Sequence, residues 1–463
     1  MAAVLCLAWS VGLDREWGTD FGVYYVGASL LSDDFQLYAD HFDHKGPAYY
    51  IFLTAIGNVI GSGAVQAVVS LFLTALAYAC SVLAIARRYT SSIPALTLVV
   101  LFTGASLAAQ NSNASIALFQ TALLLWSFHL LLKNRETGRR GFLYGSFGVF
   151  SLVVLTRIDA VLFAPMYFFV HPQEGRLREW LSSGALGIAI FGLVFFAHAL
   201  LLDFTPGQFF VHNVAFNQVH GSAYARDVLY LAYRPILFGA LLMSGLPLLL
   251  LLVVPDRFQK PDALFVTIAA IGATVLFYTN SDKNYYLFVL LAPLLMYVLS
   301  RLRRIPRRWT PAIVLTAAFL TVAVLQMAYG TLLPFVADLR NGTAFSLKSE
   351  TDLAITSALK DVHEGNVVLN RSWIYLFSGT PPGLGLNPLI YVERYDENLN
   401  VLEETGMPAM HERLISSEGS RVFLAPGSES SSNPYVQDLI DHSEAVDTVR
   451  SGGDFVLVAR EIR

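Results

Sequence analysis

Long apolar runs separated by polar loops dominate the first 340 residues of the chain. A membrane hydrocarbon core about 30 Å thick requires roughly 20 helical residues, so runs of this kind predict membrane-spanning helices. The pattern predicts a mainly α, polytopic transmembrane helical bundle of about 11 spans. The predicted spans are 1–13, 64–86, 93–109, 115–132, 142–155, 160–170, 183–202, 235–254, 263–279, 285–300 and 310–333.

Residues 341–463 show a different pattern, in which short apolar runs bounded by turn residues alternate with stretches of helical spacing. The predicted strands are 366–369, 421–424 and 455–459, and the predicted helices are 347–363 and 434–447. This alternation predicts a small C-terminal α/β domain. We therefore expect two domains, a transmembrane domain over 1–340 and an α/β domain over 341–463.

Composition sharpens this picture, because only 14% of the residues are charged and 55% are hydrophobic, with a mean hydropathy of +0.53. Ordinary soluble domains carry roughly 25% charged residues. The low charge excludes a soluble enzyme and a disordered chain, and the net charge of −4 offers no basic field for nucleic acid. The two cysteines, Cys6 and Cys80, lie in apolar runs and are interpreted as small buried hydrophobes.

The distribution of charge predicts which loops face which side of the membrane. One alternate set of loops carries 15 Lys and Arg residues, and the other set carries 6. By the positive-inside rule the first set is cytoplasmic, so loop 14–48 and residues 341–463 are extracytoplasmic. The net charge of −9 on residues 341–463, against +5 on 1–340, fits a solvated outer domain of a multi-pass plasma-membrane protein.

The predicted spans 142–155 and 160–170 are too short to cross a bilayer. At 1.5 Å per residue they reach only about 21 and 17 Å. Their junction, which contains Arg157 and Asp159, should then lie below the outer membrane surface. A charge there costs about 2.5–3.5 kcal/mol unless it is paired or lines a polar cavity. We therefore expect an outward-opening vestibule at this junction.

Candidate chemistry concentrates in loop 14–48, which holds seven acidic residues against two basic ones and several aromatic residues. Apolar residues at helical spacing from Thr19 predict a helix along the membrane surface, with Asp20 close to its N-terminus. Residues 43–47, Asp-His-Lys-Gly-Pro, bring an acid, a histidine and a lysine together. The Gly-Pro pair predicts a break in the chain before the apolar run 48–60.

These motifs resemble those of the GT-C membrane glycosyltransferases, which include the protein O-mannosyltransferases and the lipid A aminoarabinose transferase. The resemblance implies a many-span fold with an outward C-terminal domain, a polyprenyl-phosphate sugar donor and transfer on the outer face. It implies Asp20 as the catalytic base, and it places Asp43 and Lys45 near the donor phosphate and the acceptor. Gly46 stands where many relatives have proline, which puts the local backbone in question.

The chemistry of such a transfer requires a carboxylate base and cations that hold the departing phosphate. A single displacement would invert the anomeric centre. The outer loops contain few cations, and we predict Lys45, Arg157 and Lys283 as phosphate ligands. Lys283 and Tyr285 resemble the late basic–tyrosine motif of the family, and His44 is predicted to contact the substrate.

Each of these residues also has a plainer structural interpretation. The alternatives are a helix N-cap for Asp20, a mutual salt bridge for Asp43 and Lys45, and ion pairs with neighbouring aspartates for Arg157 and Lys283. Residues 40–44 alternate aspartate and histidine at a spacing that could hold a divalent metal ion. Solvated side chains are the more common outcome of such a pattern, so no metal and no other cofactor is predicted.

The sequence thus predicts a hexosyl- or pentosyltransferase that moves a sugar from a polyprenyl-phosphate donor to a glycan, lipid or protein acceptor. Its expected partners are this donor and membrane lipids, and no nucleic acid. One alternative is a transporter or flippase of lipid-linked sugars, although the sequence contains no internal repeat. Another is a scaffold whose acidic α/β domain recruits envelope partners. Loop 203–234 is long enough to form a lid, without a role for any single residue.

Overall fold

The structure of the chain is a computed structural model, in which two compact units are each built from segments distant in sequence. The described residues are 2–12, 19–31, 36–39, 43, 45–61, 63–89, 103, 107, 115–164, 167, 177–216, 330, 333–343, 353–354, 356–357, 367–368, 411–412, 415–416, 418–419, 421–424, 434–451 and 454–463. Unit 1 comprises Met1–Ser10, Leu71–Ala197 and His220–Leu333, and unit 2 comprises Val11–Ser70, His198–Val219 and Pro334–Arg463. The division into domains at residues 340 and 341 stays a prediction.

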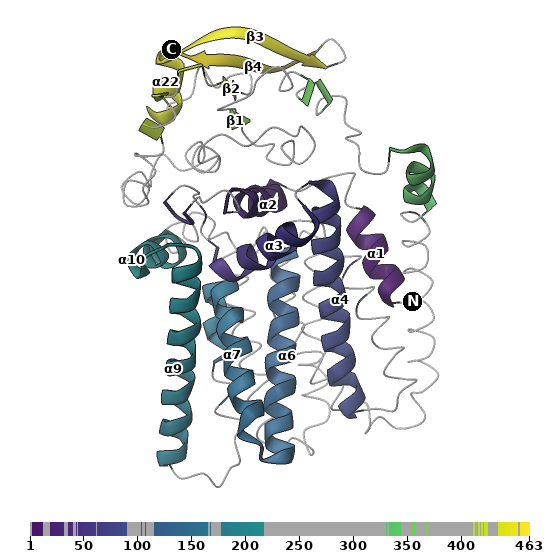
Figure 1. The fold of residues 1–463 in the computed structure, drawn as a ribbon, viewed down its shortest axis with the longest axis vertical. Coiled ribbons are helices and arrows are strands. Elements are labelled where there is room, and N and C mark those ends of the chain that lie inside the picture. The colour runs from purple at the N-terminus through teal and green to yellow at the C-terminus, as the bar shows by residue number, and fades with distance from the viewer. Residues whose placement is uncertain are drawn as a thin grey trace, which may run out of the picture. The chain divides into compact units, whose positions relative to one another are not determined.

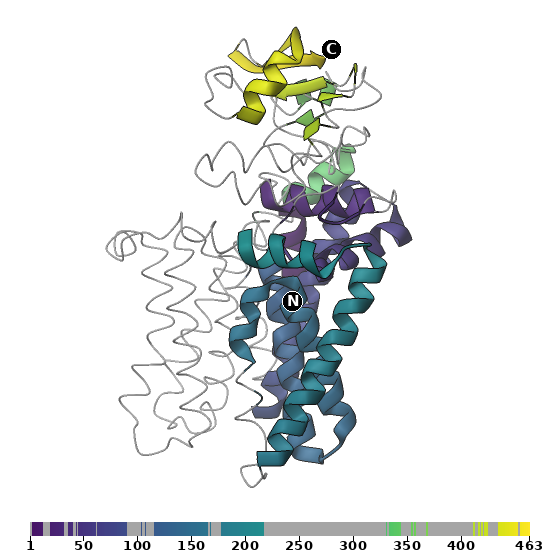
Figure 2. The ribbon, with the colours of Figure 1, turned by 90° about the vertical axis from the view of Figure 1, so that its left-hand side faces the viewer.

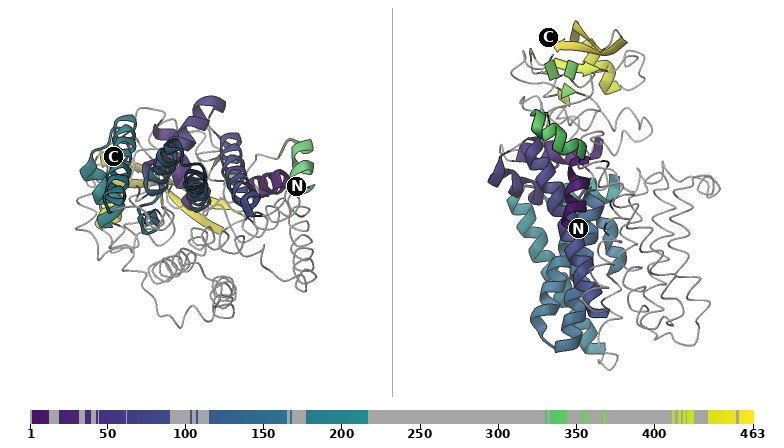
Figure 3. Two further views of the ribbon diagram at one scale, coloured as in Figure 1. Left: turned by 90° about the horizontal axis from the view of Figure 1, so that it is seen from below. Right: turned by 90° about the vertical axis from the view of Figure 1, so that its right-hand side faces the viewer.

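Unit 1 contains long apolar helices, of which α4, α6, α7 and α9 run alongside one another (Figure 1). Figure 2 shows the common direction of α6, α7 and α9 from another side, and Figure 3 shows the helices nearly end-on. In chain order the helices are α1 Ala2–Gly12, α4 Ala64–Tyr89, α6 Ser115–Thr137, α7 Arg140–Thr156 and α9 Leu177–Leu201. The first residues of α4 and the last residues of α9 belong to unit 2.

Three helices among the described residues are long and apolar enough to cross a membrane. They are Ala64–Arg87, Ser115–Asn134 and Leu181–Leu201, which coincide with three of the predicted spans. Only 17% of the apolar window in α9 is buried within the protein, as expected for a helix that faces lipid. The predicted spans 235–254, 263–279 and 285–300 lie outside the described residues, as do most of 93–109 and 310–333, so the count of about 11 stays a prediction.

The structure describes only part of the predicted span 160–170, which follows α7. Helix α7 has 17 residues and ends where Arg157 adopts extended backbone dihedrals, φ −156° and ψ 128°. The chain then continues as the 3-10 helix η3, Ile158–Phe163, whose hydrogen bonds run over three residues instead of four. Within the predicted span 160–170, residues 160–163 belong to this 3-10 helix, Ala164 to a turn and Tyr167 to a helix. The other residues of 160–170 lie outside the described ones, so the span itself stays a prediction.

Small polar residues hold α6 and α7 together. Ser146 Oγ donates to Ser127 O at 2.7 Å, and Ser127 Oγ lies 3.1 Å from Ser146 O. The hydroxyl of Tyr167 lies 2.7 Å from Ser127 Oγ and 2.9 Å from Ser146 Oγ. Small hydroxyl residues allow close approach of membrane helices and provide hydrogen bonds across their interface. This cluster therefore explains the tight α6–α7 pair without any functional role.

The N-terminal half of unit 2 pairs two short helices, α2 Thr19–Leu31 and α3 Pro47–Ile60. Both begin where the sequence predicts, α2 at Thr19 and α3 at the Gly46–Pro47 break. Proline at the first helical position suits a helix start because its missing N–H would have no intrahelical partner there. The two helices contact through the Tyr24 ring, which meets Tyr49 and Tyr50 edge-on at 5.7 and 6.3 Å.

A second segment of unit 2 follows the end of α9. Helix α10, Pro206–Phe210, begins with a capping box in which Thr205 and Gln208 each bind the backbone of the other. It continues directly into a π-helical turn, η4, Val211–Ala215. This segment contacts Leu37, Tyr38 and Asp43, and it supplies much of the site described below.

The C-terminal residues of unit 2 form a four-stranded sheet with strand order β1-β2-β4-β3. The strands are β1 Val367–Val368, β2 Arg421–Leu424, β3 Ser443–Ser451 and β4 Asp454–Ile462, and helix α22 covers Pro434–Asp441. β1 and β2 are parallel, whereas β4 pairs antiparallel with both β2 and β3. Figure 1 shows β3 and β4 as a long hairpin beside α22.

The predicted helix 434–447 is only partly correct, because α22 ends at Asp441 and β3 begins at Ser443. The segment that follows α22 contains Val446, Thr448 and Val449, whose branched side chains favour strands. β3 pairs with β4 from Ser443 opposite Ile462 to the end of the strand. This long-range pairing overrides the local helical spacing.

Candidate functional site

The residues predicted for the site divide between the two units. Asp43 and Lys45 lie in unit 2, and Arg157 lies in unit 1. Asp20 is the second residue of α2, as predicted, and its side chain lies outside the described part of the chain. The remaining predicted residues, His44, Lys283 and Tyr285, also lie outside the described residues.

Asp43 is completely buried, with an exposed fraction of 0%. Its carboxylate oxygen Oδ2 accepts a hydrogen bond from the hydroxyl of Tyr50 on α3. Its backbone oxygen lies 3.1 Å from Nδ1 of His212 in η4. Burial of a carboxylate is costly unless hydrogen bonds or opposite charges compensate it, so this acid is held in a built environment. The alternative for Asp43, a mutual salt bridge with Lys45, stays a prediction.

Lys45 is buried as well, with 4% of its surface exposed, and it lies one residue before the N-cap of α3. The N-cap is Gly46, in extended conformation, which has no side chain to accept from the N–H groups of the first turn. The N-terminal end of a helix carries partial positive charge. The start of α3 therefore favours an anion, and Lys45 is the buried basic residue that precedes it in the chain.

Tyr38 connects these two residues to the rest of unit 2. Its backbone has a φ of +72°, which is uncommon for a residue other than glycine, and the side chain is 1% exposed. Its hydroxyl donates to Lys45 O at 2.8 Å and accepts from Asn213 Nδ2 at 2.8 Å. Burial raises the pKa of the Tyr38 phenol well above its usual range, and the nearby Asp43 carboxylate raises it further. Tyr38 therefore stays protonated and available as a donor.

His212 and Asn213 are the residues of this site that sequence reasoning missed. Both are 1% exposed, and both come from η4, about 170 residues after loop 14–48 in the sequence. The sequence assigned the surrounding loop 203–234 only a general role as a lid. The available signal was two adjacent polar residues inside an aromatic stretch that includes Phe204, Phe209 and Phe216.

Arg157 belongs to a separate polar cluster within unit 1. Its guanidinium NH2 lies 2.5 Å from Asp159 Oδ2, and 7% of the residue is exposed. Gln120 on α6 donates from Nε2 to Asp159 Oδ1 at 3.2 Å and approaches Arg157 O at 3.4 Å. The plainer alternative for Arg157, an ion pair with its neighbouring aspartate, is therefore present. Its role as a phosphate ligand stays a prediction.

A metal centre has no support in the described part of the chain, where no group of three or more His, Cys, Asp and Glu side chains could hold a metal ion. The predicted alternative involved residues 40–44, and of these only Asp43 is described. The prediction that no metal takes part therefore stays a prediction.

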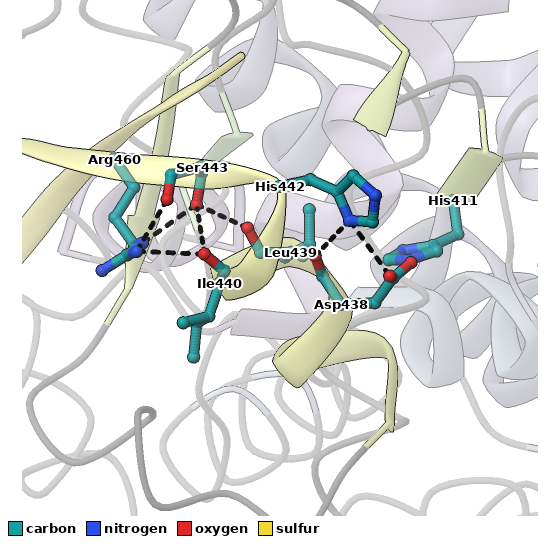
Figure 4. A network of polar contacts seen from close by, with 7 residues as sticks. All are labelled: His411, Asp438, Leu439, Ile440, His442, Ser443 and Arg460. Atoms are coloured by element: carbon teal, nitrogen blue, oxygen red, sulfur yellow. Dashed lines mark hydrogen bonds and ion pairs between the residues drawn. The ribbon is translucent and has the colours of Figure 1, made fainter.

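A further polar network lies beside the C-terminal sheet (Figure 4). Asp438 binds two histidines, His411 Nε2 at 2.7 Å and His442 Nδ1 at 3.1 Å. Arg460 of β4 donates to Ile440 O in the last turn of α22 at 3.1 Å and to Ser443 O at the start of β3 at 2.8 Å. A cation that binds the last carbonyl groups of a helix stabilises its C-terminus. The network therefore explains how α22 is fixed to the sheet.

The fold is similar to that of two crystal structures of ArnT from Cupriavidus metallidurans, ArnT being a lipid A aminoarabinose transferase of the GT-C superfamily. The structure bound to undecaprenyl phosphate superposes with a TM-score of 0.60 at 15% identity, over 99% of this chain and 96% of that chain. The apo structure gives 0.57 at 14% identity, over 98% and 95%.

The oligosaccharyltransferase of Archaeoglobus fulgidus, in complex with Zn and sulfate, is also similar. It gives a TM-score of 0.50 at 12% identity, over 98% of this chain and 72% of that chain. No protein-family model and no curated protein matches the sequence. The predicted resemblance to the GT-C superfamily is therefore confirmed at the level of the fold.

Proposed function

Because this chain has a GT-C fold, we propose that it is a membrane glycosyltransferase that moves a sugar from a polyprenyl-phosphate donor to an acceptor hydroxyl. The observation that carries the proposal is the buried pair Asp43 and Lys45, directly before the N-terminus of α3. Charged residues are almost never fully buried unless they are paired, so the burial of both Asp43 and Lys45 requires compensating partners. In a chain whose fold matches ArnT over 99% of its length, a donor site is the purpose that fits these charges.

The donor phosphate is the anion for which we propose the environment of Lys45. As the bond from the sugar to the phosphate breaks, negative charge grows on the leaving phosphate. The Lys45 ammonium and the N–H groups at the start of α3 would stabilise this charge in place of water. Lys283, Tyr285, His44 and Arg157 stay predicted as further donor contacts.

The proposed reaction is a single displacement at the anomeric carbon. The acceptor oxygen forms a bond to this carbon, while the bond from the carbon to the phosphate oxygen breaks and polyprenyl phosphate leaves. The acceptor proton passes to a carboxylate, for which we propose Asp20, in the first turn of α2. Asp43 would orient the reacting groups, with its own carboxylate held by the Tyr50 hydroxyl. The anomeric configuration would invert.

The proposed location of this reaction is the outer face of the plasma membrane. It follows from the distribution of Lys and Arg over the loops, which assigns loop 14–48 and residues 341–463 to the outside. An enzyme with this orientation would act on donors that have already been moved across the membrane. The acceptor would be a glycan, a lipid or a protein on that side.

The test uses the purified chain in lipid nanodiscs with undecaprenyl-phosphate-linked hexose and pentose donors and a membrane extract as the source of acceptor. Release of undecaprenyl phosphate and labelled product are both measured. Removal of a general base lowers rates by about 10²–10⁴-fold, so Asp20→Asn should reduce both signals by this factor. Asp441→Asn, an exposed acid on α22, is the matched control. Near-normal transfer by Asp20→Asn would refute the assignment of the base.

The Lys45 assignment is tested by direct binding of undecaprenyl phosphate. Lys45→Ala should weaken binding by about 10-fold or more, because it removes a buried charge that faces the proposed phosphate. The control is Lys133→Ala, which removes a lysine near the C-terminal end of α6, outside the proposed site. Equal binding by the Lys45 and Lys133 variants would refute the phosphate role. A flippase would instead move donor across vesicles and form no covalent product.

A further inference from the structure

We propose that residues 198–216, called the 198–216 segment, position Asp43 and Lys45 for the reaction. The segment acts through its residues His212 and Asn213 and through Tyr38, to which Asn213 is bonded. This inference rests on the proposed function. The three residues are positioning residues, because their hydrogen bonds lead to the backbone carbonyl groups of the reactive pair. All of the residues involved belong to unit 2, so the arrangement is internal to one compact unit.

The 198–216 segment first fixes the backbone at the start of the reactive loop. The amide of Leu37 donates to Leu202 O at 3.3 Å. Gln36 Nε2 donates to the carboxylate of Asp203 at 2.5 Å. These two bonds attach consecutive residues of loop 14–48 to the turn that follows α9. The backbone is therefore fixed at Gln36 and Leu37. Gln36 lies seven residues before Asp43 and nine residues before Lys45.

The ring of Tyr38 is then enclosed by aromatic side chains of the same segment. Phe204 and Phe209 meet it edge-on, with ring centroids at 5.3 and 6.5 Å, and His212 lies against it at 4.8 Å. Such pairs contribute about 0.5–1.5 kcal/mol each beyond burial. A positive φ at a residue other than glycine costs of order 1–3 kcal/mol, and it persists only where the surroundings determine it. The contacts with Phe204, Phe209 and His212 hold Tyr38 in this backbone conformation.

The hydrogen bonds of Tyr38 have a single consistent direction. Lys45 O is a carbonyl oxygen and can only accept, so the one phenolic proton is donated to it. The phenolic oxygen can then accept from the amide nitrogen of Asn213. The chain Asn213 to Tyr38 to Lys45 is therefore ordered from donor to acceptor. An aspartate at position 213 would reverse this order, because its carboxylate cannot donate.

His212 provides the second anchor in the same way. Asp43 O can only accept, so Nδ1 of His212 carries the proton of the bond between them. Adjacent residues of an α-helix point about 100° apart. His212 and Asn213 are adjacent and both reach the loop, one at Asp43 and the other through Tyr38 to Lys45. The π-helical turn η4, a feature frequently found at functional sites, accommodates this pair.

The 198–216 segment therefore holds the carbonyl groups of both Asp43 and Lys45. A displacement of about 1 Å in a reacting group can cost on the order of 10²-fold in rate, so fixing these two carbonyls has a direct kinetic value. The bonds cross sequence separations of 169 and 175 residues, so no local feature of loop 14–48 could replace them.

The test compares two substitutions of one residue. His212→Leu removes the donor to Asp43 O, whereas His212→Asn keeps an N–H at the position of Nδ1. For His212→Leu we expect kcat to fall about 10–100-fold with undecaprenyl-phosphate-linked sugar, whereas His212→Asn should stay within about 3-fold of wild type. Tyr38→Phe and Asn213→Asp should also lower kcat about 10-fold or more, and Tyr144→Phe, an exposed tyrosine, should not.

Hydrogen exchange of the amides in residues 36–46 separates this inference from the proposed function. In His212→Leu these amides should exchange faster than in wild type, and in His212→Asn they should not, with similar thermal midpoints for both variants. Unchanged exchange in His212→Leu would overturn the positioning role, even if the wild type transfers sugar. Absence of transfer by the wild type would overturn the proposed function alone. Equal losses of kcat in the leucine and asparagine variants would indicate simple packing and would also overturn the positioning role.

Discussion

Tyr25→Phe removes one hydroxyl from the point where α2, α3 and the start of α4 meet. The hydroxyl lies 2.7 Å from Gly63 O, contacts Gln66 Oε1, and accepts from the Gly63 amide at 3.0 Å. Gln66 in turn donates to Leu53 O at 2.8 Å. Tyr25 is 1% exposed. The substitution therefore removes a buried hydroxyl that bonds Gly63 and Gln66 at the start of α4, and Gln66 in turn bonds α3.

The magnitude follows from these bonds. One phenolic proton can serve only one acceptor at a time, so phenylalanine loses one donated and one accepted hydrogen bond, at about 0.5–1.5 kcal/mol each. The Gly63 amide or the Gln66 oxygen is then left without this partner, at about 1–3 kcal/mol. We expect a loss of about 2–6 kcal/mol in the free energy of unfolding. With an unfolding entropy near 2.1 cal/mol/K per residue, this lowers the thermal midpoint by about 2–6 °C.

The assay is thermal unfolding in nanodiscs, with Tyr144→Phe as the matched control because its side chain on α7 is exposed. The control should change the free energy of unfolding by less than about 0.5 kcal/mol. Equal midpoints for wild type and Tyr25→Phe, or an equal decrease in the control, would refute the reasoning. The outcome also bears on function, since α2 carries Asp20.

A pH series provides a second measurement of the same residue. Burial raises the pKa of the Tyr25 phenol above its usual value near 10. Above pH 10 the unfolded chain therefore binds fewer protons at this residue than the folded chain, and the free energy of unfolding falls as pH rises. The slope is at most about 1.4 kcal/mol per pH unit. The difference between wild type and Tyr25→Phe should thus shrink above pH 10 and stay constant below it.

Three further substitutions test the packing of each unit. Gly187→Ala should be less stable than Gly184→Ala on the same helix by about 1–2 kcal/mol in thermal unfolding, because a Cβ at 187 would lie 3.0 Å from the Phe147 ring and a Cβ at 184 meets nothing within 4 Å. Tyr167→Phe should lower the midpoint by loss of hydroxyl contacts to both α6 and α7, at about 1–2 kcal/mol. Arg460→Met should increase hydrogen exchange at the end of α22 while exchange in α6 is unchanged, since it removes the donor to Ile440 O in the last turn of α22 and to Ser443 O at the start of β3.

The N-terminal ends of α2 and α3, which carry the candidate site residues of unit 2, could be predicted because each depends only on neighbouring residues. Thr19 begins α2, which places Asp20 in the first turn, and the Gly46–Pro47 pair begins α3 directly after Lys45. Caps and prolines act over one helical turn, so the sequence contains all the information that they need. The apolar runs of α4, α6 and α9 were predictable for the same reason, since length and composition alone decide whether a helix can span a bilayer.

Other features depended on partners that are far away in the sequence. The residues after Asp441 have helical spacing, and only their pairing with β4 makes them a strand. Arg157 was expected to bind phosphate or to pair with Asp159, and the choice depends on the geometry of the turn into η3 and on Gln120 from another helix. Local patterns cannot decide between such alternatives, because the energies that do so come from tertiary contacts.

The sequence by itself determined that the chain contains helices long enough to span a membrane and an acidic, aromatic first loop. Both features follow from the hydrophobic pattern and the charges within single segments. Only the tertiary structure decided that Asp43 and Lys45 are buried and that His212 and Asn213 reach them. Burial and hydrogen bonding are properties of pairs of segments. The segments in question lie about 170 residues apart, and no local pattern in either of them specifies the other.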